Sequence, residues 1–304
     1  MVDRKRKSIV IALIGFLAVI ETGYCMGRKG PDYRMGKLIH DLTAYDLKTK
    51  KSSSLAEPEH RRTGYTWLSP DGKWVIYTEQ QKRNAPEQDD LYLVSVGGTK
   101  ERHIVGGLGV NIDYLAWLPD SNGFTFTSYK YVDRKSVDYG LFRYDLGKST
   151  GPVLIPIVKK GGLEFIKFVK WFPNGDGFVC VGTEHDRDTN LYRVSADGSS
   201  YQQIGDFPGV VMIDLSPDGK KIAMTWQEGL YFVDIDGTHL VQLRKPASYN
   251  LFWPVWSPDG QWILYKMMNV RGDYLGWYVI NVETGRSRHV IDNVSDLQWW
   301  APKK

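Results

Sequence analysis

Trp256-Ser-Pro-Asp-Gly260 is one of six copies of a short motif that recurs along this chain of 304 residues. In each copy, an apolar run that carries Trp or Leu ends in a proline. The six prolines lie at positions 70, 119, 173, 217, 258 and 302, so they are 49, 54, 44, 41 and 44 residues apart. Spacings of roughly 40 to 50 residues are typical of the four-stranded blades of a β-propeller. The sequence therefore predicts an all-β, circular array of sheets.

Each copy also predicts its own local structure. Ser-Pro-Asp-Gly is turn chemistry, because Ser bonds back to the backbone, Pro presets φ and Gly accepts the positive φ that follows. A β-branched or aromatic strand follows each turn, as in Trp262-Ile-Leu-Tyr265. About 20 residues after each turn comes a second strand signature, such as Leu191-Tyr-Arg-Val-Ser195, and then a glycine turn and a short strand such as Leu240 to Leu243. No long amphipathic helix is expected after residue 30.

One stretch resembles a known family of repeats. Glu184-His-Asp-Arg-Asp-Thr-Asn-Leu-Tyr-Arg-Val-Ser-Ala-Asp-Gly198, together with the motif at Trp256, looks like the WD40-like Pro-Asp repeats of TolB-like propellers. The resemblance covers residues 37 to 302 and implies a six-bladed β-propeller. Related repeats also occur in peptidase propellers, sugar-lyase propellers and many periplasmic proteins, so the resemblance implies the fold more than the function. The small α/β domain that precedes the propeller in TolB has no counterpart in these residues.

The two ends of the repeat region are expected to close the ring. Asp296 to Trp300 reads as a first strand without later strands to pair with it. Arg34 to His40 could supply a second strand, Leu42 to Leu47 a third and Lys50 to Leu55 a fourth. A sheet built from both ends would remove the exposed sheet edges that promote aggregation. The sequence thus predicts six blades, the sixth of which is closed by both termini.

Residues 1–30 read as a separate segment before a propeller at 31–304. Asp3 to Lys7 is basic and Ser8 to Ile20 is apolar, which is the layout of an export signal. Lipidation at Cys25, cleavage near Cys25 to Gly27 and an uncleaved membrane anchor all remain open. This segment holds six basic and two acidic side chains, which accounts for the whole formal charge of +4. The protein is expected in the periplasm or associated with the cell envelope, without nucleic-acid partners.

Catalytic motifs are absent from the sequence. It contains no Gly-x-Ser-x-Gly elbow, no His-Glu-x-x-His and no phosphate loop, and neither a cofactor nor a metal is expected. Cys180 is expected to be buried and inert. Asp186-x-Asp188-x-Asn190 has calcium-like spacing, but a hairpin turn is the favoured interpretation. The six histidines could still converge with Arg and carboxylates near the axis; they are His40, His60, His103, His185, His239 and His289.

The expected binding surface is the propeller face that collects the links between blades and the connections from second to third strands. These connections are long at Gln80 to Asp90, Tyr129 to Gly140 and Asn269 to Gly276, in blades interpreted as adjacent. Their mixture of aromatic and basic residues is typical of interface hot spots. The candidate partner-binding residues are His60, Arg61, Arg62, Lys82, Arg83, Tyr129, Tyr131, Arg134, Arg271 and Tyr274.

Two function classes are compatible with this interpretation of the sequence. The first is a noncatalytic, monomeric envelope protein that binds another protein or a cell-wall component through this face. Because acidic residues are interleaved with the basic ones, a partner with acidic or mixed charge is expected. The second is a propeller enzyme, a lyase or hydrolase, that acts on an anionic saccharide. An enzyme would require His, Arg and carboxylate side chains that converge within about 4 to 6 Å of one point.

Overall fold

A computed structural model describes the part of the chain in which the repeats lie. Two compact units are distinguished, Met1–Asp32 and Tyr33–Lys304, and every described residue belongs to the second. Among the described residues no helix is long and apolar enough to cross a membrane. The expected export segment lies outside the described residues, which are 37–40, 43–46, 51–56, 63–80, 89–105, 111–132, 135–148, 150–157, 162–184, 188–245, 248–292 and 297–300.

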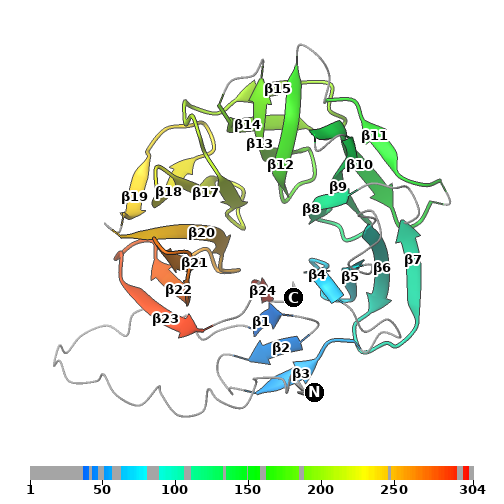
Figure 1. Ribbon diagram of the computed structural model, residues 1–304, viewed down its shortest axis with the longest axis horizontal. Helices are drawn as coiled ribbons and strands as arrows, with labels where there is room; N and C mark the ends of the chain where they lie inside the picture. The colour runs from blue at the N-terminus through cyan, green and yellow to red at the C-terminus, as the bar shows by residue number, and fades with distance from the viewer. Residues whose placement is uncertain are drawn as a thin grey trace. The chain divides into compact units, whose positions relative to one another are not determined.

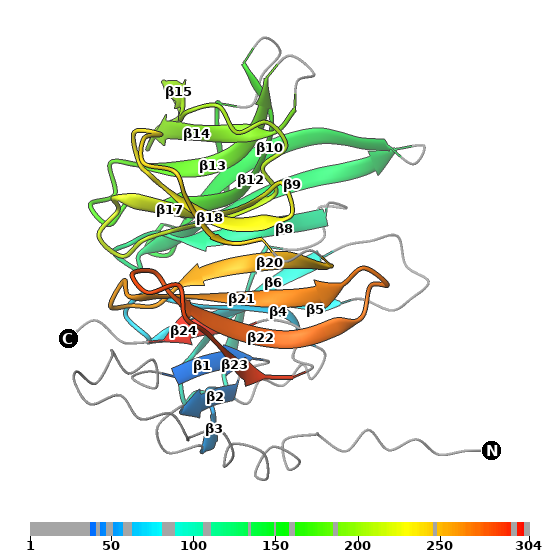
Figure 2. The ribbon, with the colours of Figure 1, turned by 90° about the vertical axis from the view of Figure 1, so that its left-hand side faces the viewer.

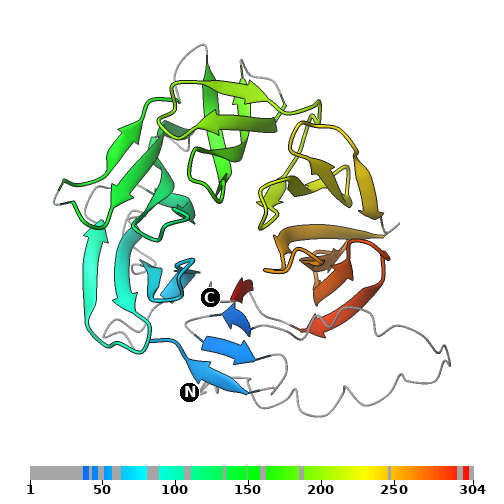
Figure 3. The same ribbon diagram turned by 180° about the vertical axis from the view of Figure 1, so that it is seen from behind.

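The described residues form six four-stranded antiparallel sheets and no helix. In the second unit the sheets follow one another around a ring (Figures 1 and 3). Five of them, which we call blades one to five, each consist of four consecutive strands. Blade one has β4 (Thr63–Leu68), β5 (Trp74–Gln80), β6 (Asp89–Ser95) and β7 (Glu101–Val105); blade two has β8 (Asn111–Trp117), β9 (Gly123–Val132), β10 (Lys135–Asp145) and β11 (Val153–Ile155).

The remaining blades continue the order along the chain. Blade three has β12 (Leu163–Trp171), β13 (Gly177–Glu184), β14 (Asn190–Ser195) and β15 (Tyr201–Gln203); blade four has β16 (Met212–Leu215), β17 (Lys221–Trp226), β18 (Gly229–Asp234) and β19 (Val241–Arg244); blade five has β20 (Tyr249–Trp256), β21 (Trp262–Asn269), β22 (Tyr274–Asn281) and β23 (Ser287–Ile291).

The sixth sheet joins strands from the two ends of the repeat region. Its order is β24 (Gln298–Trp300), β1 (Lys37–His40), β2 (Thr43–Asp46) and β3 (Ser52–Ser54). Lys37 lies opposite Trp300, and Leu38 lies opposite Trp299. We call this the closing sheet. Its four strands match the segments from which the sequence predicts them, so the expected pairing between the two ends is confirmed.

The Ser-Pro-Asp-Gly turns are held by the same hydrogen bonds in three copies. In blade four, Ser216 Oγ donates to Asp218 Oδ1 at 2.6 Å and accepts from Lys221 N at 2.8 Å. Asp218 Oδ1 also accepts from Lys220 N at 3.0 Å. Partial burial would raise the pKa of Asp218, but these hydrogen bonds hold that pKa below its usual value. The same bonds recur around Ser69 and Ser257.

Neighbouring turns touch through their proline and glycine residues. A methyl group placed on Gly175 would lie 3.5 Å from Pro119 Cγ, and one on Gly219 would lie 2.9 Å from Pro173 Cδ. Blade two has Ser121 where the turns of the other four blades have glycine, and its Oγ accepts a 3.0 Å bond from the Asp71 amide of blade one. We call this series of contacts the turn belt. It links the five blades at one end of their inner strands.

The repeated tryptophans pack between blades, as the sequence predicts. Trp117 and Trp171 are buried, and each indole N–H donates into the preceding blade. Trp117 Nε1 bonds to the Trp67 carbonyl at 3.1 Å, and Trp171 Nε1 bonds to Thr125 Oγ1 at 3.0 Å. Cys180 lies in the core between blades two and three, where burial raises the pKa of its thiol. The expectation that Cys180 is buried is therefore confirmed.

Gly219→Ala should test the turn belt. The backbone φ of Gly219 is +73°, so alanine should cost about 1–2 kcal/mol in backbone strain. Contact of the new methyl group with Pro173 should add about 1–3 kcal/mol. Gly209→Ala is the matched control, because φ is +78° there and no atom lies within 4 Å of the new methyl group. Urea unfolding should show the larger loss in Gly219→Ala; equal losses would contradict the belt contact.

Deletion of residues 297–304 should test ring closure. It removes β24 with buried Leu297 and with Trp299, which packs in the core between blade five and the closing sheet. Losing large buried side chains costs about 3–5 kcal/mol each, so the melting temperature should fall by roughly 10 °C or more. Deletion of 301–304 alone is the control and should have little effect. A 297–304 deletion that melts at the wild-type temperature would exclude closure by β24.

Candidate functional site

The two ends of the ring differ in what they carry. In each blade the turn after the third strand bonds back to the turn after the first: Val96 N donates to Lys73 O at 2.8 Å, and Ile235 N donates to Lys220 O at 2.9 Å. Both kinds of turn therefore share one end, which we call the turn face. The opposite end, the loop face, carries the links between blades and the connections from second to third strands. Figure 2 shows the β9–β10 and β21–β22 hairpins projecting on this side.

Only part of the predicted binding surface lies within the described residues. Tyr129 and Tyr131 lie on β9, Tyr274 begins β22, and Arg271 lies in the turn between β21 and β22. The other candidates fall outside the described residues, so their role stays a prediction; they are His60, Arg61, Arg62, Lys82, Arg83 and Arg134.

The segment from Tyr129 to Gly140 is a hairpin rather than the expected irregular loop. β9 and β10 continue their pairing, with Val137 opposite Lys130 and Val132 opposite Lys135. The register shifts between Val137 and Gly140. The tyrosines and valines of this segment favour strand structure, which outweighs the charged residues that suggest a loop. Tyr129 and Tyr131 are therefore held on a strand.

The three blades expected to carry the site are not adjacent. The closing sheet lies between blade five and blade one (Figure 1). Leu297, at its inner end, packs in a cluster with Trp262 and Trp277 of blade five. On the other side, Gln298 Nε2 donates to the Thr66 carbonyl of blade one. The sequence predicts this sheet, and because its strands come from both ends of the repeat region it separates blade five from blade one, so the expectation that these blades are adjacent is wrong.

Tyr274 is held in place by a buried lysine. Lys266 is 3% exposed, and its Nζ lies 3.7 Å from the centre of the Tyr274 ring. The same ammonium group lies 5.2 Å from the Trp253 ring and 5.7 Å from the Trp277 ring. Cation–π contacts strengthen when the cation is desolvated. The buried side of the Tyr274 ring is thus fixed, while 48% of the residue remains exposed.

The turn that carries Arg271 is also well defined. Asn269 Oδ1 accepts from the amides of Arg271 and Asp273, both at 2.9 Å, and Asn269 Nδ2 donates to Asp273 Oδ2 at 3.0 Å. Gly272 adopts φ of +89°. This is a four-residue connection, shorter than the loop expected from Asn269 to Gly276. It presents exposed Arg271 beside Val270, which is 73% exposed.

Several exposed residues of the loop face are missing from the sequence-based candidates. Four such large apolar side chains are exposed near strand ends on this side: Tyr65 of blade one, Val211 before blade four, and Tyr249 and Val270 of blade five. Tyr65 is 54% exposed near the start of β4, and Tyr249 begins β20. For Tyr65 and Tyr249, the signal that could have revealed them is their position before the repeat tryptophan. That position places them at the loop-face end of an inner strand.

The inner strands also share a strained aromatic position. Tyr114, Phe168 and Trp253 each lie three residues before the repeat tryptophan, and their φ angles are 44°, 53° and 49°. In all three strands the register shifts at this point, which marks a β-bulge. The Tyr114 and Phe168 rings are 4.3 Å apart. Bulges that re-aim a side chain are frequent near functional sites.

An ion pair links three inner strands. Lys170 Nζ on β12 lies 2.8 Å from Asp214 Oδ1 on β16, and Asp214 Oδ2 accepts from the Trp256 amide on β20 at 2.7 Å. Asp214 is buried, so its ion pair and its hydrogen bond lie in a low-dielectric environment, which strengthens both. Within the described part of the chain, no three His, Cys, Asp or Glu side chains are grouped to hold a metal ion.

Comparison with curated proteins finds two relatives. A Sulfurisphaera tokodaii protein named as a Tricorn-like protease C-terminal subunit is 32% identical over 117 residues, which is 38% of this chain and 13% of that protein. Dipeptidyl-peptidase 5 of Porphyromonas gingivalis is 20% identical over 294 residues, 90% of this chain and 40% of that protein. The chain thus spans less than half the length of each. No family model matches the chain.

Solved structures show the fold. TolB from Acinetobacter baumannii gives a TM-score of 0.62 at 17% identity, covering 88% of this chain and 67% of that one. A protein from Agrobacterium tumefaciens named as TolB gives 0.60 at 17% identity, covering 83% and 86%. An oligogalacturonate lyase in complex with manganese gives 0.59 at 14% identity, covering 81% and 73%. At these identities the likeness establishes a TolB-like β-propeller fold and leaves the function open.

Lys170→Met should weaken the inner ring. The change leaves the buried Asp214 carboxylate without its counter-charge, so unfolding free energy should fall by about 1–3 kcal/mol. Lys148→Met is the matched control. Lys148 pairs with Asp145 at the same 2.8 Å distance but is well exposed, so its loss should cost less than about 0.5 kcal/mol. Chemical denaturation would measure the unfolding free energy of both variants. Similar losses in the two would show that the Lys170–Asp214 pair stabilises the fold no more than a surface ion pair does.

Proposed function

We propose that this chain, whose fold is that of the TolB-like propellers, is a noncatalytic binding scaffold of the cell envelope. It would be exported, and it would hold an envelope protein or a cell-wall component on the loop face. The observation that carries this proposal is that Val270 and Tyr274 are exposed at one hairpin of blade five, where Tyr249 is exposed at the paired end of β20. Tyr65, Tyr249, Val270 and Tyr274 are all partly or largely exposed there.

Exposed apolar groups beside charged side chains support binding. Soluble proteins seldom leave large apolar residues exposed together unless they contact a partner or a ligand. Tyr and Arg are enriched at interface hot spots, and Tyr274 lies three residues after exposed Arg271. Asp273 lies between them, so the surface carries both charges. This supports a partner of mixed or acidic charge.

The fixed conformation of the β21–β22 hairpin supports a binding role as well. The Lys266 ammonium group contacts the buried side of the Tyr274 ring, and the Asn269 side chain bonds to the turn that precedes Tyr274. Side chains that are ordered before binding lose less conformational entropy when a partner arrives. This hairpin can therefore bind a partner without rearranging.

Export belongs to the same proposal. The basic and apolar residues of 1–30 have the layout of an export signal. The fold likeness to TolB proteins supports an envelope location in the periplasm. The chain would act there as a monomer, with contact to the membrane only through residues 1–30. Fractionation that finds the full-length protein in the cytosol would argue against this part.

The alternative is a propeller enzyme that acts on an anionic saccharide. Likeness to an oligogalacturonate lyase supports considering it. The two functions differ in a simple assay: an enzyme would shorten an oligouronate chain over time, whereas a scaffold would leave it intact. If the purified protein shortens the oligouronate, and variants with the histidines replaced do not, the enzyme would be favoured.

The combined variant Arg271→Ala, Tyr274→Ser should weaken partner binding. Both side chains are largely exposed, so the protein should stay folded, but loss of the Tyr274 ring also removes its contact with Lys266 and should lower the melting temperature by roughly 5 °C. Capture of the envelope partner on the immobilised protein should fall by at least about tenfold if either residue is a hot spot. Quantitative mass spectrometry of bound envelope proteins, together with binding to isolated cell-wall material, would measure it.

The matched control removes side chains from the opposite end. Lys73→Ala, Lys220→Ala, Gln261→Ala changes three exposed residues of the turn face and should leave capture unchanged. A third variant, Arg61→Ala, Arg62→Ala, Arg134→Ala, extends the test to predicted residues outside the described ones. Loss of capture with the turn-face control and full capture with both loop-face variants would place the partner at the wrong end for this proposal.

A further inference from the structure

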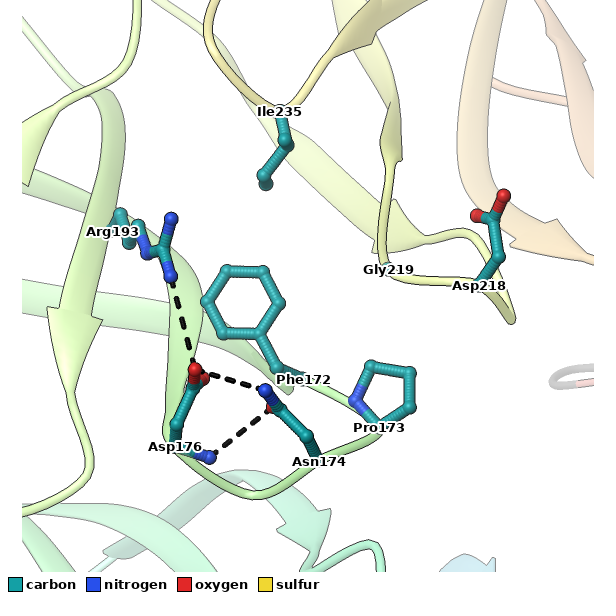
Figure 4. Close-up of a pocket in the computed structure, with 8 residues that line it drawn as sticks. All are labelled: Phe172, Pro173, Asn174, Asp176, Arg193, Asp218, Gly219 and Ile235. Atoms are coloured by element: carbon teal, nitrogen blue, oxygen red, sulfur yellow. Dashed lines mark hydrogen bonds and ion pairs between the residues drawn. The ribbon is translucent and has the colours of Figure 1, made fainter.

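A small cavity opens on the turn face between blades three and four. Its volume is about 260 Å³. Its lining comes from the first turn of blade three, the first turn of blade four, and two flanking residues, Arg193 on β14 and Ile235 after β18. The cavity therefore lies on the opposite end from the proposed partner surface. The eight lining residues are shown in Figure 4.

The cavity exists where blade three departs from the repeat. In three copies the residue before the turn proline is a serine that bonds within the turn: Ser69, Ser216 and Ser257. Blade three has Phe172 at this position. The phenyl ring packs in the core between blades three and four and forms one wall of the cavity. Pro173 and Ile235 extend this apolar wall.

Arg193 brings a cation to the cavity, beside the Phe172 ring. Its guanidinium carbon lies 4.8 Å from the centre of the Phe172 ring. Figure 4 shows Arg193, Phe172 and Ile235 turned toward the same space. An arginine that stacks on an aromatic ring keeps its N–H groups free in the plane of the guanidinium, where they match a carboxylate. The stacking reduces the entropy lost when an anion binds.

A carboxylate stands beside this cation without a close bond to it. Arg193 Nη2 and Asp176 Oδ2 are 3.9 Å apart, which exceeds hydrogen-bond distance, and both side chains are 53% exposed. Asn174 Nδ2 donates to Asp176 Oδ2 at 2.9 Å and steadies the carboxylate. The other carboxylate of the lining, Asp218, is engaged by Ser216 and Lys220. The cavity thus offers one positive and one negative group side by side.

We propose that this cavity binds a free α-amino acid with an apolar side chain. Its carboxylate would meet the Arg193 guanidinium, its ammonium group would meet Asp176, and its side chain would pack against Phe172, Pro173 and Ile235. The spacing favours this ligand class, because an α-amino acid carries both charges on one carbon atom. A dipeptide separates them by a further residue and fits a gap of 3.9 Å less well.

The charge pattern also disfavours ligands that carry a single charge. A plain carboxylate would gain Arg193 but would meet repulsion from Asp176, and an amine would meet the reverse. A zwitterion satisfies both groups at once. The volume of about 260 Å³ suits a single amino acid and is below that of most cofactor pockets. Few contacts are available in so small a site, so affinity should be about 1 mM or somewhat tighter.

Ligand-observed NMR titration of the full chain would test the site. The probe is L-leucine, compared with 4-methylpentanoate, which lacks the ammonium group, and 3-methylbutylamine, which lacks the carboxylate. Leucine should bind saturably, and each analogue should bind at least about tenfold more weakly. Absence of leucine binding up to about 50 mM would overturn the proposal, and so would binding of 4-methylpentanoate as tight as that of leucine.

Variants would place the binding in this cavity. Arg193→Met should weaken leucine binding at least about tenfold, and Asp176→Asn should weaken leucine binding but not 4-methylpentanoate binding. Arg143→Met is the matched control, since Arg143 has the same place in blade two but donates to Asp145 at 2.8 Å. Leucine binding unchanged by Arg193→Met would overturn the assignment.

The site is independent of the proposed partner surface. The loop-face variant Arg271→Ala, Tyr274→Ser should bind leucine as the wild type does. Loss of leucine binding in that variant, with the variant still folded, would show that leucine binds at the loop face instead. Each side chain changed in the cavity is exposed or partly exposed, so the variants should stay folded.

Discussion

The pairing of β24 with β1 is the constraint on which the rest of the ring depends. Each blade contacts mainly its two neighbours, so the ends of such an array would expose sheet edges and apolar faces. The closing sheet covers both. Leu297 joins the core of blade five, while Gln298 bonds to the Thr66 carbonyl of blade one. A single three-residue strand thus connects two blades that are far apart in sequence.

The sequence predicts the blades and the closing pairing well, because the signals for them are local and repeated. Ser, Pro, Asp and Gly each have a conformational preference that specifies the turn at its own position. The hydrogen bonds around Ser216 and Asp218 match those preferences. The strand Asp296 to Trp300 could be assigned because it occupies a known phase of the repeat. Once the period is known, a strand without later partners requires them from the other end.

The surface is predicted less well, because it depends on contacts between blades. The buried position of Lys266 under Tyr274 cannot be deduced from spacing, since it requires rings from β20 and β22 around one ammonium group. The β9–β10 hairpin is not predicted, because the charged residues between Tyr129 and Gly140 suggest a loop. The cavity beside Arg193 forms where two turns meet. Alignment of the copies would have provided one clue, since Phe172 stands where the other turns have Ser or Leu.

The bulges at Tyr114, Phe168 and Trp253 have a consequence for how this ring can change. A left-handed backbone at a bulky residue costs of order 1–3 kcal/mol, and this chain has it at one position in three blades. Glycine or asparagine at any of these sites would relieve the strain. Each replacement would also remove a packed ring, since the Tyr114 and Phe168 ring centroids lie 4.3 Å apart and Trp253 lies beside the Lys266 ammonium group. The strain is therefore the cost of holding an aromatic side chain at a position where glycine would be the relaxed choice.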